Sequence, residues 1–428
     1  MLGRLDLRDV SGDVRPHLPR PEVAGEGPVE AVRAIIASVR EGGDAAIAEL
    51  TERFDGVSLG SLRVPDEDVA AARDRVPSEV RQALAVATRR IRSFHEAQLR
   101  SPTRWTEDGV TITSSWSPVR RAGCYVPGGR AAYPSTVLMT AIPARVAGVE
   151  QVVVCVPPDR STGRVADVTL AAAAEAGVDD VFAIGGAQAI AALAYGTESI
   201  SPVDVVCGPG NRYVAIAKQE VAGEVGVAAA FAGPSEIVVV ADGTAPADHV
   251  AIDLMVQAEH GPDGLAWLIT WDPGVVDAVD AEVTRLVGAA PRRAEIEATL
   301  ATAGRAVLCR DEAQAMEVAN AIAPEHLQLV CADPHALVPE VRNAGAVFLG
   351  PWGPASLGDY AAGPSHVLPT NGSARFSSAL TVDDFTRHHH VVEVTRDGFE
   401  RLAPTVRTLA EAEGLDAHAE SIRLRCRP

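Results

Sequence analysis

The stretch Gly123-Cys-Tyr-Val-Pro-Gly-Gly129 marks the point at which the sequence begins to alternate between strand and helix patterns. Its own pattern is that of a strand that ends in a glycine-rich turn. Further strand-like runs follow at 152–156, 181–184 and 205–207, and helical runs separate them at 165–176 and 187–195. Continuous apolar strands separated by helices are typical of a parallel sheet that is covered on both faces.

The same alternation returns in the second half of the chain. Its strand-like runs lie at 237–241, 266–270, 306–309, 327–330 and 347–349. Ahead of the first block, helical periodicity covers 28–54, with a break at Gly42-Gly43, and then 78–99. An alternating strand pattern covers 110–116. The sequence therefore predicts an α/β fold with two parallel-sheet units.

The two ends of the chain follow neither pattern. Residues 1–25 combine a short apolar stretch with three prolines, and the chain after Gly350 is irregular until a helical pattern near 399–411. We interpret both ends as extensions beyond the two sheet units. Such extensions often clasp a second copy of the chain, so a homodimer is predicted.

The composition and net charge of the chain disfavour some classes of binding partner. Of 428 residues, 47% are hydrophobic and 22% charged, which is ordinary for a globular protein, and the net charge is −19. An acidic chain favours neither nucleic acid nor an anionic membrane as partner. No signal-peptide core or membrane-spanning run is visible, and the six cysteines contain no CxxC pair. These features predict a cytoplasmic protein with reduced thiols.

Three glycine-rich turns follow predicted strands, at 125–129, 185–188 and 207–211. Ligands of parallel sheets bind at the carboxyl ends of strands, and glycine lets a phosphate approach the backbone closely. The nearest match to a dinucleotide fingerprint, Gly208-Pro-Gly-Asn-Arg-Tyr213, lacks its third glycine. Taken alone, each of these segments is explained as an ordinary turn without a ligand. Three in succession leave a nucleotide site and plain turns as equal alternatives.

The segment Gln257-Ala-Glu-His-Gly-Pro262 ends a helix that is predicted from residue 248. Gln257 and His260 are three residues apart, so they share one helix face and can approach one ion. Adding Asp359 and His418 gives two nitrogen and two oxygen ligands, a set compatible with zinc. The alternatives are a histidine that binds the last helix carbonyls and an aspartate that caps a loop. We interpret the run His388-His389-His390 as surface.

Glu325 and His326 follow Pro324, which places them in the loop before a strand. An imidazole suits general-base work near neutral pH, and an adjacent carboxylate could hold a water molecule. The alternative is a solvated glutamate beside a histidine that caps the strand.

Taken together, these motifs resemble the histidinol dehydrogenase family. The resemblance extends over nearly the whole chain and rests on seven segments. They are Tyr125-Val-Pro-Gly-Gly129, Phe231-Ala-Gly-Pro-Ser-Glu236, Gln257-Ala-Glu-His-Gly-Pro262, Ala323-Pro-Glu-His-Leu327, Gly358-Asp-Tyr-Ala361, Gly363-Pro-Ser-His-Val-Leu-Pro369 and Glu413-Gly-Leu-Asp-Ala-His418. The resemblance implies oxidation of L-histidinol to L-histidine through an aldehyde, using two NAD in succession and a zinc ion, in the last steps of histidine biosynthesis.

The resemblance also implies roles for individual residues. The implied zinc ligands are Gln257, His260, Asp359 and His418, and the implied acid–base pair is Glu325 and His326. The implied NAD contacts are Tyr125, Gln188 and Asn211. The implied substrate contacts are Ser235, Gln257, His260, His326, Asp359, Glu413 and His418, with His366 as a further match whose role stays open.

The family's fold implies two incomplete Rossmann-like domains in a homodimer with intertwined arms, in which His418 serves the neighbouring subunit. We accordingly expect an N-terminal arm (1–25), a metal and catalytic domain (26–124 with 235–380), an NAD domain (125–234) and a dimerisation tail (381–428). Three alternatives stay open. They are a relative that oxidises another small alcohol such as a sulfonated diol, a zinc hydrolase without NAD, and an inactive binding or scaffold protein.

Overall fold

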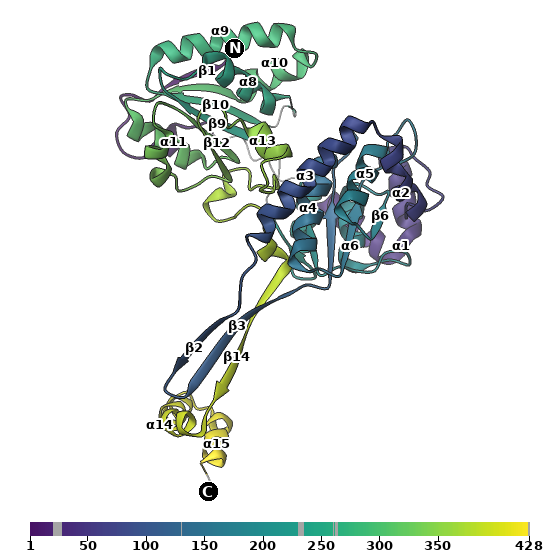
Figure 1. The fold of residues 1–428 in the computed structure, drawn as a ribbon, viewed down its shortest axis with the longest axis vertical. Coiled ribbons are helices and arrows are strands. Elements are labelled where there is room, and N and C mark those ends of the chain that lie inside the picture. The colour runs from purple at the N-terminus through teal and green to yellow at the C-terminus, as the bar shows by residue number, and fades with distance from the viewer. Residues whose placement is uncertain (20–27, 130, 230–234, 260, 262–263, 427–428) are drawn as a thin grey trace. The chain divides into compact units, whose positions relative to one another are not determined.

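The computed structural model describes residues 1–19, 28–129, 131–229, 235–259, 261 and 264–426. The chain divides into two compact units. Unit 1 comprises 1–98 and 119–385, and unit 2 comprises 99–118 and 386–428. Unit 1 holds two parallel sheets with helices around them (Figure 1). The predicted α/β class with two parallel-sheet units is confirmed.

The larger sheet has six parallel strands in the order β1-β11-β10-β9-β12-β13. The strands are β1 (Gly3–Asp6), β9 (Glu236–Ala241), β10 (Leu265–Thr270), β11 (Gly304–Leu308), β12 (His326–Val330) and β13 (Ala346–Leu349). The helices of this half are α8 (Ala247–Ala258), α9 (Pro273–Ala289), α10 (Arg293–Ala303), α11 (Glu312–Ile322), α12 (Pro334–Leu337) and α13 (Ala355–Tyr360). Short 3-10 turns lie at Arg15–His17, Val338–Glu340, Ser373–Arg375 and Val382–Phe385.

Alternate residues of β9 enter different cores. Ile237 and Val239 pack with α8, α9 and α10, whereas Val238 and Val240 pack with α11. Successive side chains of a strand point to opposite faces, so a continuous apolar run is buried on both.

The first residues of the chain belong to this sheet. β1 pairs in parallel with β11, and Leu7 and Val14 are buried in the core beneath α11. This differs from the expectation that 1–25 form an arm outside the core. The four-residue strand is too short to show a clear period, which is why the sequence pattern missed it.

The smaller sheet has five parallel strands in the order β6-β5-β4-β7-β8. The strands are β4 (Arg121–Tyr125), β5 (Gln151–Cys155), β6 (Asp180–Phe182), β7 (Val205–Cys207) and β8 (Gly226–Val227). The helices of this half are α1 (Val29–Asp55), α2 (Asp66–Arg75), α3 (Ser78–Glu96), α4 (Pro134–Ala147), α5 (Asp167–Ala176), α6 (Gly186–Tyr195) and α7 (Arg212–Glu220). α1 is bent at Gly43, where a break was predicted.

The helices α1 to α3 cover the smaller sheet rather than the larger one. α1 shares a core with α6 and α7, and α3 shares one with α4 and α5. This differs from the expectation that residues 26–124 join 235–380 in one domain. Helix amphipathicity shows that a face is buried but not which sheet buries it.

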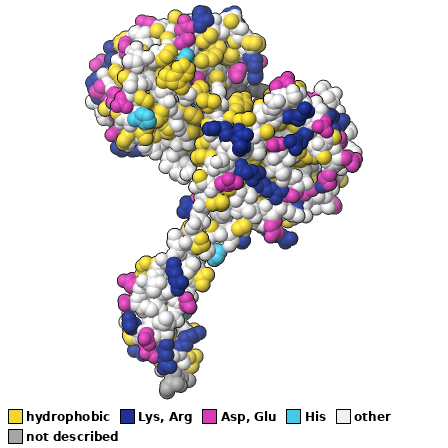
Figure 2. Space-filling view, in the orientation of Figure 1, with side chains coloured by type: hydrophobic (Ala, Val, Ile, Leu, Met, Phe, Trp, Pro, Cys, Tyr) yellow, Lys and Arg dark blue, Asp and Glu magenta, His cyan; other side chains and the backbone are white. Residues whose placement is uncertain are grey.

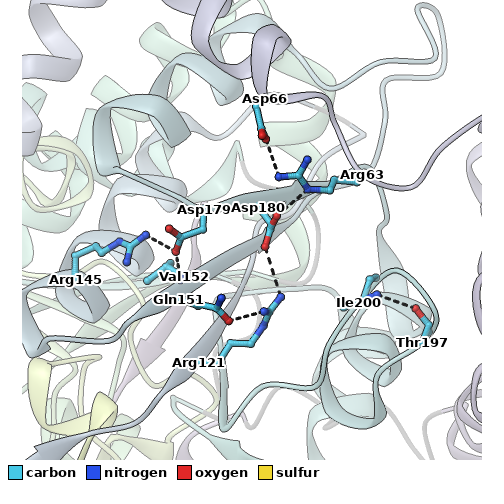
Figure 3. A network of polar contacts seen from close by, with 10 residues as sticks. All are labelled: Arg63, Asp66, Arg121, Arg145, Gln151, Val152, Asp179, Asp180, Thr197 and Ile200. Atoms are coloured by element: carbon cyan, nitrogen blue, oxygen red, sulfur yellow. Dashed lines mark hydrogen bonds and ion pairs between the residues drawn. The ribbon is translucent and has the colours of Figure 1, made fainter.

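The amino ends of β4, β5 and β6 are tied by ion pairs (Figure 3). Arg121 lies 2.7 Å from the Gln151 amide oxygen and 3.6 Å from Asp180, and Arg63 reaches the same Asp180 at 2.7 Å. Arg145 pairs with Asp179, whose carboxylate also accepts the Val152 amide. These contacts occupy the amino ends of the three strands. The carboxyl ends of the strands are left to other contacts.

Unit 2 is an antiparallel ribbon of β2 (Thr103–Glu107), β3 (Val110–Pro118) and β14 (Thr386–Val394), followed by α14 (Arg396–Ala412) and α15 (Asp416–Arg425). The predicted strand at 110–116 is confirmed as part of β3. The run His388-His389-His390 is exposed on β14, as predicted. The helices of unit 2 bury few residues, among them Ala403, Ala410 and Ala419.

Two further sequence predictions can be compared with the fold. Within the described ranges, no helix is both long and apolar enough to cross a bilayer. All six cysteines are free thiols, four of them buried.

Candidate active site

Glu325 and His326 lie where β12 begins, at the amino end of the strand. α11 ends at Ile322, and Ala323 then turns the chain with a φ of 55°. Glu325 occupies the turn and His326 is the first residue of β12, level with Ile237 of β9. Both side chains are buried, with 7% and 3% of their surface exposed. The predicted position before the strand is confirmed for Glu325, whereas His326 is already part of β12. The solvated alternative is wrong for Glu325.

The His326 ring is held in one tautomer. Its Nδ1 lies 2.9 Å from the carbonyl oxygen of Glu236, which can only accept a hydrogen bond. Nδ1 therefore carries the hydrogen, and Nε2 is left as the proton-accepting nitrogen. Nε2 lies 3.4 Å from Oδ1 of Asp359. Burial alone would lower the pKa of His326, but the charges of Glu325 and Asp359 outweigh burial and raise that pKa.

Asp359 is positioned from α13 through a second histidine. Its carbonyl oxygen accepts from Nδ1 of His366 at 2.8 Å, and Nε2 of His366 lies 3.1 Å from the Thr136 hydroxyl. Desolvation lowers the pKa of His366, so its ring is neutral at neutral pH. His366 thus links the Asp359 backbone to α4, and a contact with the substrate stays a prediction.

Gln257 is the buried polar side chain that most needs a ligand. It lies in the last turn of α8 as predicted, with 1% of its surface exposed. Neither its amide oxygen nor its amide nitrogen has a hydrogen-bond partner among the described residues. A buried amide without partners is costly, and an amide oxygen bound to a metal ion would remove part of that cost. The residue therefore fits the predicted metal site.

Of the other predicted ligands, Asp359 alone lies in the described part of unit 1. His260 lies outside the described residues, and His418 lies in unit 2 on α15. Within the described part of the chain, no three His, Cys, Asp or Glu side chains are grouped as a metal site would require. Of the four predicted ligands, unit 1 places Gln257 and Asp359, and the metal site stays a prediction.

The predicted substrate residues divide between the two units. Ser235 is half-buried immediately before β9, and its carbonyl accepts the Leu265 amide at 3.1 Å. It directly precedes Glu236, whose amide contacts Glu325. Glu413 ends α14 and, like His418, is exposed in unit 2. A role for these two residues beside Ser235 stays a prediction.

The predicted cofactor turns meet at the carboxyl edge of the smaller sheet. The hydroxyl of Tyr125, at the end of β4, accepts the Gly186 amide at 3.1 Å. Gly208 follows β7 with a φ of 105°, and a Cβ there would lie 2.0 Å from the Tyr125 carbonyl oxygen. Only glycine permits this contact. Strand order reverses beside β4, which is where ligands of such sheets bind.

The other cofactor residues are already engaged in the turns. Asn211 caps α7, accepting the amides of Tyr213 and Val214 at 3.0 and 3.2 Å. Gln188 is buried in α6. Both shape the turns on which they lie, and their contact with NAD stays a prediction.

Sequence reasoning missed two buried charged residues. Glu236 begins β9 beside Glu325, and Lys218 of α7 donates to the Gly208 carbonyl at 3.0 Å and the Ala229 carbonyl at 3.3 Å. Burial lowers the pKa of Lys218 to about 8. A signal existed for Glu236, because a carboxylate directly before the apolar run 237–241 is unusual in a buried strand.

Known proteins are similar over almost the full length. A sequence family described as histidinol dehydrogenase matches residues 18–426. A histidinol dehydrogenase of Parasynechococcus marenigrum is 49% identical over 395 residues, covering 92% of this chain and 90% of the relative. One of Pseudomonas syringae pv. tomato is 48% identical, covering 99% and 95%. The crystal structure of histidinol dehydrogenase from Elizabethkingia anophelis superposes with a TM-score of 0.94 at 34% identity, covering 99% and 98%.

Proposed function

Because the chain belongs to the histidinol dehydrogenase family, we propose that it oxidises L-histidinol to L-histidine through the aldehyde, using two NAD and a bound zinc ion. The observation that carries this proposal is the buried Glu325–His326 pair, with the His326 tautomer fixed by the Glu236 carbonyl. We also propose that the protein acts in the cytoplasm, in the last steps of histidine biosynthesis. An inactive scaffold is disfavoured, since a scaffold has no need of two buried titratable groups side by side.

His326 is the base of the first oxidation. Its Nε2 accepts the hydroxyl proton of the alcohol as the hydride leaves for the nicotinamide. The neighbouring carboxylates raise its pKa, so they stabilise the imidazolium that forms once Nε2 has taken the proton. Nδ1 keeps its hydrogen on the Glu236 carbonyl throughout, so the ring does not turn away between the two steps.

Glu325 is the base of the second oxidation. An aldehyde has no hydroxyl to lose, so water must add before a second hydride can leave. Glu325 removes a proton from that water, and the hydrate then passes its hydride to the second NAD. Because both residues are buried side by side, the two steps share one site, which limits loss of the aldehyde to solvent between them.

Gln257, His260, Asp359 and His418 would hold the zinc ion. When bound, zinc supplies a charged site for the imidazole and amine of the substrate. Ser235 and Glu413 add contacts to the substrate, and a carboxylate at Glu413 suits its ammonium group. That pairing favours histidinol over a sulfonated diol.

NAD lies against the Tyr125, Gln188 and Asn211 turns in this proposal. The close approach of Gly208 to the Tyr125 carbonyl brings two glycine-rich turns together at the strand ends, where a dinucleotide can bind. This feature favours an NAD enzyme over a zinc hydrolase.

A homodimer is also proposed, and the surface of unit 2 supports it. The described part of the unit exposes many large apolar side chains on β14, α14, α15 and the turn between the two helices. They are Val391, Val392, Val394, Leu402, Val406, Leu409, Leu415 and Leu424. Figure 2 shows hydrophobic side chains among acidic and basic ones at the surface of this unit. A three-stranded ribbon with two helices gains stability when a second copy covers such side chains.

The direct test follows NADH absorbance with the purified protein, histidinol and NAD. We expect a steady rise that a chelator abolishes and added zinc restores, with two NADH formed for each histidine. One NADH for each substrate, or a rate indifferent to the chelator, would contradict the two-step zinc mechanism.

Replacing Gln257 with leucine separates metal binding from folding. We expect Gln257→Leu to contain less zinc, measured by mass spectrometry of the metal, because one oxygen ligand is lost. The metal-free variant should nevertheless melt at a higher temperature than metal-free wild type, because the unpaired buried amide is gone. His260→Asn should lower the zinc content as well.

Gln314→Leu is the matched control. Gln314 is also buried, but its amide bonds the Leu7 carbonyl and the Arg310 amide at 2.8 and 2.7 Å. This variant should melt at a lower temperature and keep its zinc. Full zinc content in Gln257→Leu would remove Gln257 from the metal site.

A further inference from the structure

Glu236 and Glu325 exchange hydrogen bonds in both directions. The Glu236 amide donates to Oε2 of Glu325 at 2.8 Å, and the Glu325 amide donates to Oε2 of Glu236 at 3.3 Å. The two residues stand at the start of neighbouring parallel strands, β9 and β12. Each carboxyl group therefore holds the backbone of the other residue.

Glu236 makes two more contacts that converge on the same site. Its Oε1 accepts the Asn371 amide at 3.0 Å, where Asn371 has a left-handed φ of 54°. Its carbonyl oxygen accepts Nδ1 of His326 at 2.9 Å. One buried residue thus contacts Glu325, His326 and the loop at 371.

We propose that Glu236 is a positioning residue for both oxidations: its carboxyl group fixes Glu325 and its carbonyl group fixes the His326 ring. The proposal rests on the proposed function, because it takes Glu325 and His326 as the acid–base pair. Glu236 acts on the reaction through these two residues. Displacing a reacting group by about 1 Å can cost about 10²-fold in rate, so the contacts that hold it matter.

The protonation of Glu236 supports this role. Burial first, and the charge of Glu325 second, raise the pKa of Glu236 to about 8. At neutral pH Glu236 therefore keeps its proton and adds no second negative charge beside Glu325. Two carboxylates this close repel each other once both are ionised.

Among the described residues, few other charges surround Glu236. From the β12 side, Glu325 and His326 are the titratable groups that act on it. From the β10 side it lies level with the apolar Leu265, and from the loop it meets the uncharged Asn371 amide. Raising the pH through about 8 therefore changes the charge of Glu236 beside Glu325.

Two substitutions separate the ionisation of Glu236 from the length of its side chain. Glu236→Gln keeps the length and cannot ionise, but it offers one acceptor oxygen in place of two. Glu236→Asp keeps an ionisable carboxyl group but is one methylene shorter, so it cannot bond both the Glu325 and Asn371 amides. The assay uses the full-length zinc enzyme and measures, across alkaline pH, NADH formed from histidinol and from supplied aldehyde.

We expect Glu236→Asp to lower kcat for the aldehyde by about 10²-fold while KM for NAD stays unchanged. Glu236→Gln keeps one of the two backbone contacts, so we expect a smaller loss of rate at neutral pH than in Glu236→Asp, and it should lack the alkaline inflection that the wild type shows near pH 8. A residue with a merely structural role would not move the pH profile. If Glu236→Asp does not fold, the pH profile of Glu236→Gln alone tests the inference.

Asp384→Asn is the control, because Asp384 also has a pKa raised by burial and holds the Thr381 amide at 2.7 Å. It should leave the pH profile unchanged.

The inference is overturned if Glu236→Gln keeps the wild-type inflection, or if Glu236→Asp oxidises the aldehyde at full rate. Glu325→Gln is assayed alongside: if it is slow while both Glu236 variants are normal, the inference fails and the proposed function stands. If Glu325→Gln is normal, the proposed function fails.

Discussion

Glu325→Gln is expected to oxidise histidinol to the aldehyde but to lose most of the second oxidation. Losing a general base typically costs about 10²–10⁴ in rate, and only the second step needs an activated water molecule. The amide oxygen of the new side chain can still accept the Glu236 amide, so the site keeps its shape. Supplied aldehyde should therefore be oxidised about 10²–10⁴ times more slowly than by wild type.

His326→Asn gives the complementary result. We expect it to slow histidinol oxidation at least as severely, because the proton acceptor of the first step is gone. Glu312→Gln, at an exposed position on α11, is the control and should change neither step. Normal oxidation of supplied aldehyde by Glu325→Gln would show that another group activates the water.

Refolding two inactive variants together is expected to restore activity. Asp359→Asn and His418→Asn should each be nearly inactive alone, because each lacks one zinc ligand. If His418 serves the neighbouring subunit, a mixed dimer carries both lesions in one site and none in the other. Random pairing then restores about a quarter of all sites. The motivation is that His418 is exposed on α15 of unit 2, whereas Asp359 belongs to unit 1.

A second pair of variants provides the control. Asp359→Asn refolded with Gln257→Leu places both lesions in unit 1, and trans sharing of His418 leaves every site of that mixed dimer with one lesion. No activity should return. Mixed dimers of Asp359→Asn and His418→Asn that form by mass but stay inactive would show that each site draws on one chain.

The order of elements was predictable because it depends on local patterns. The run 237–241 is apolar at every position, and it forms a strand buried on both faces. Gly261 follows a helix end and Gly43 bends α1, both as predicted. The motifs around Gln257 and Glu325 could be recognised because their residue types follow one another along the chain.

Partnerships between distant segments were not predictable. Nothing near residue 3 shows that it pairs with residue 305, and nothing in α1 shows which sheet it covers. The same holds for Glu236, which lies 89 residues from Glu325 and yet exchanges two hydrogen bonds with it.

The sequence by itself determined the α/β class, most of the strands and helices, the family, and the residue types available for the chemistry. Only the tertiary structure decided which sheet each helix covers, which tautomer His326 holds, and that Glu236 lies against Glu325. The physical reason is that secondary structure follows the local period of apolar residues. A hydrogen bond, a pKa shift or a shared core instead depends on atoms that only folding brings together.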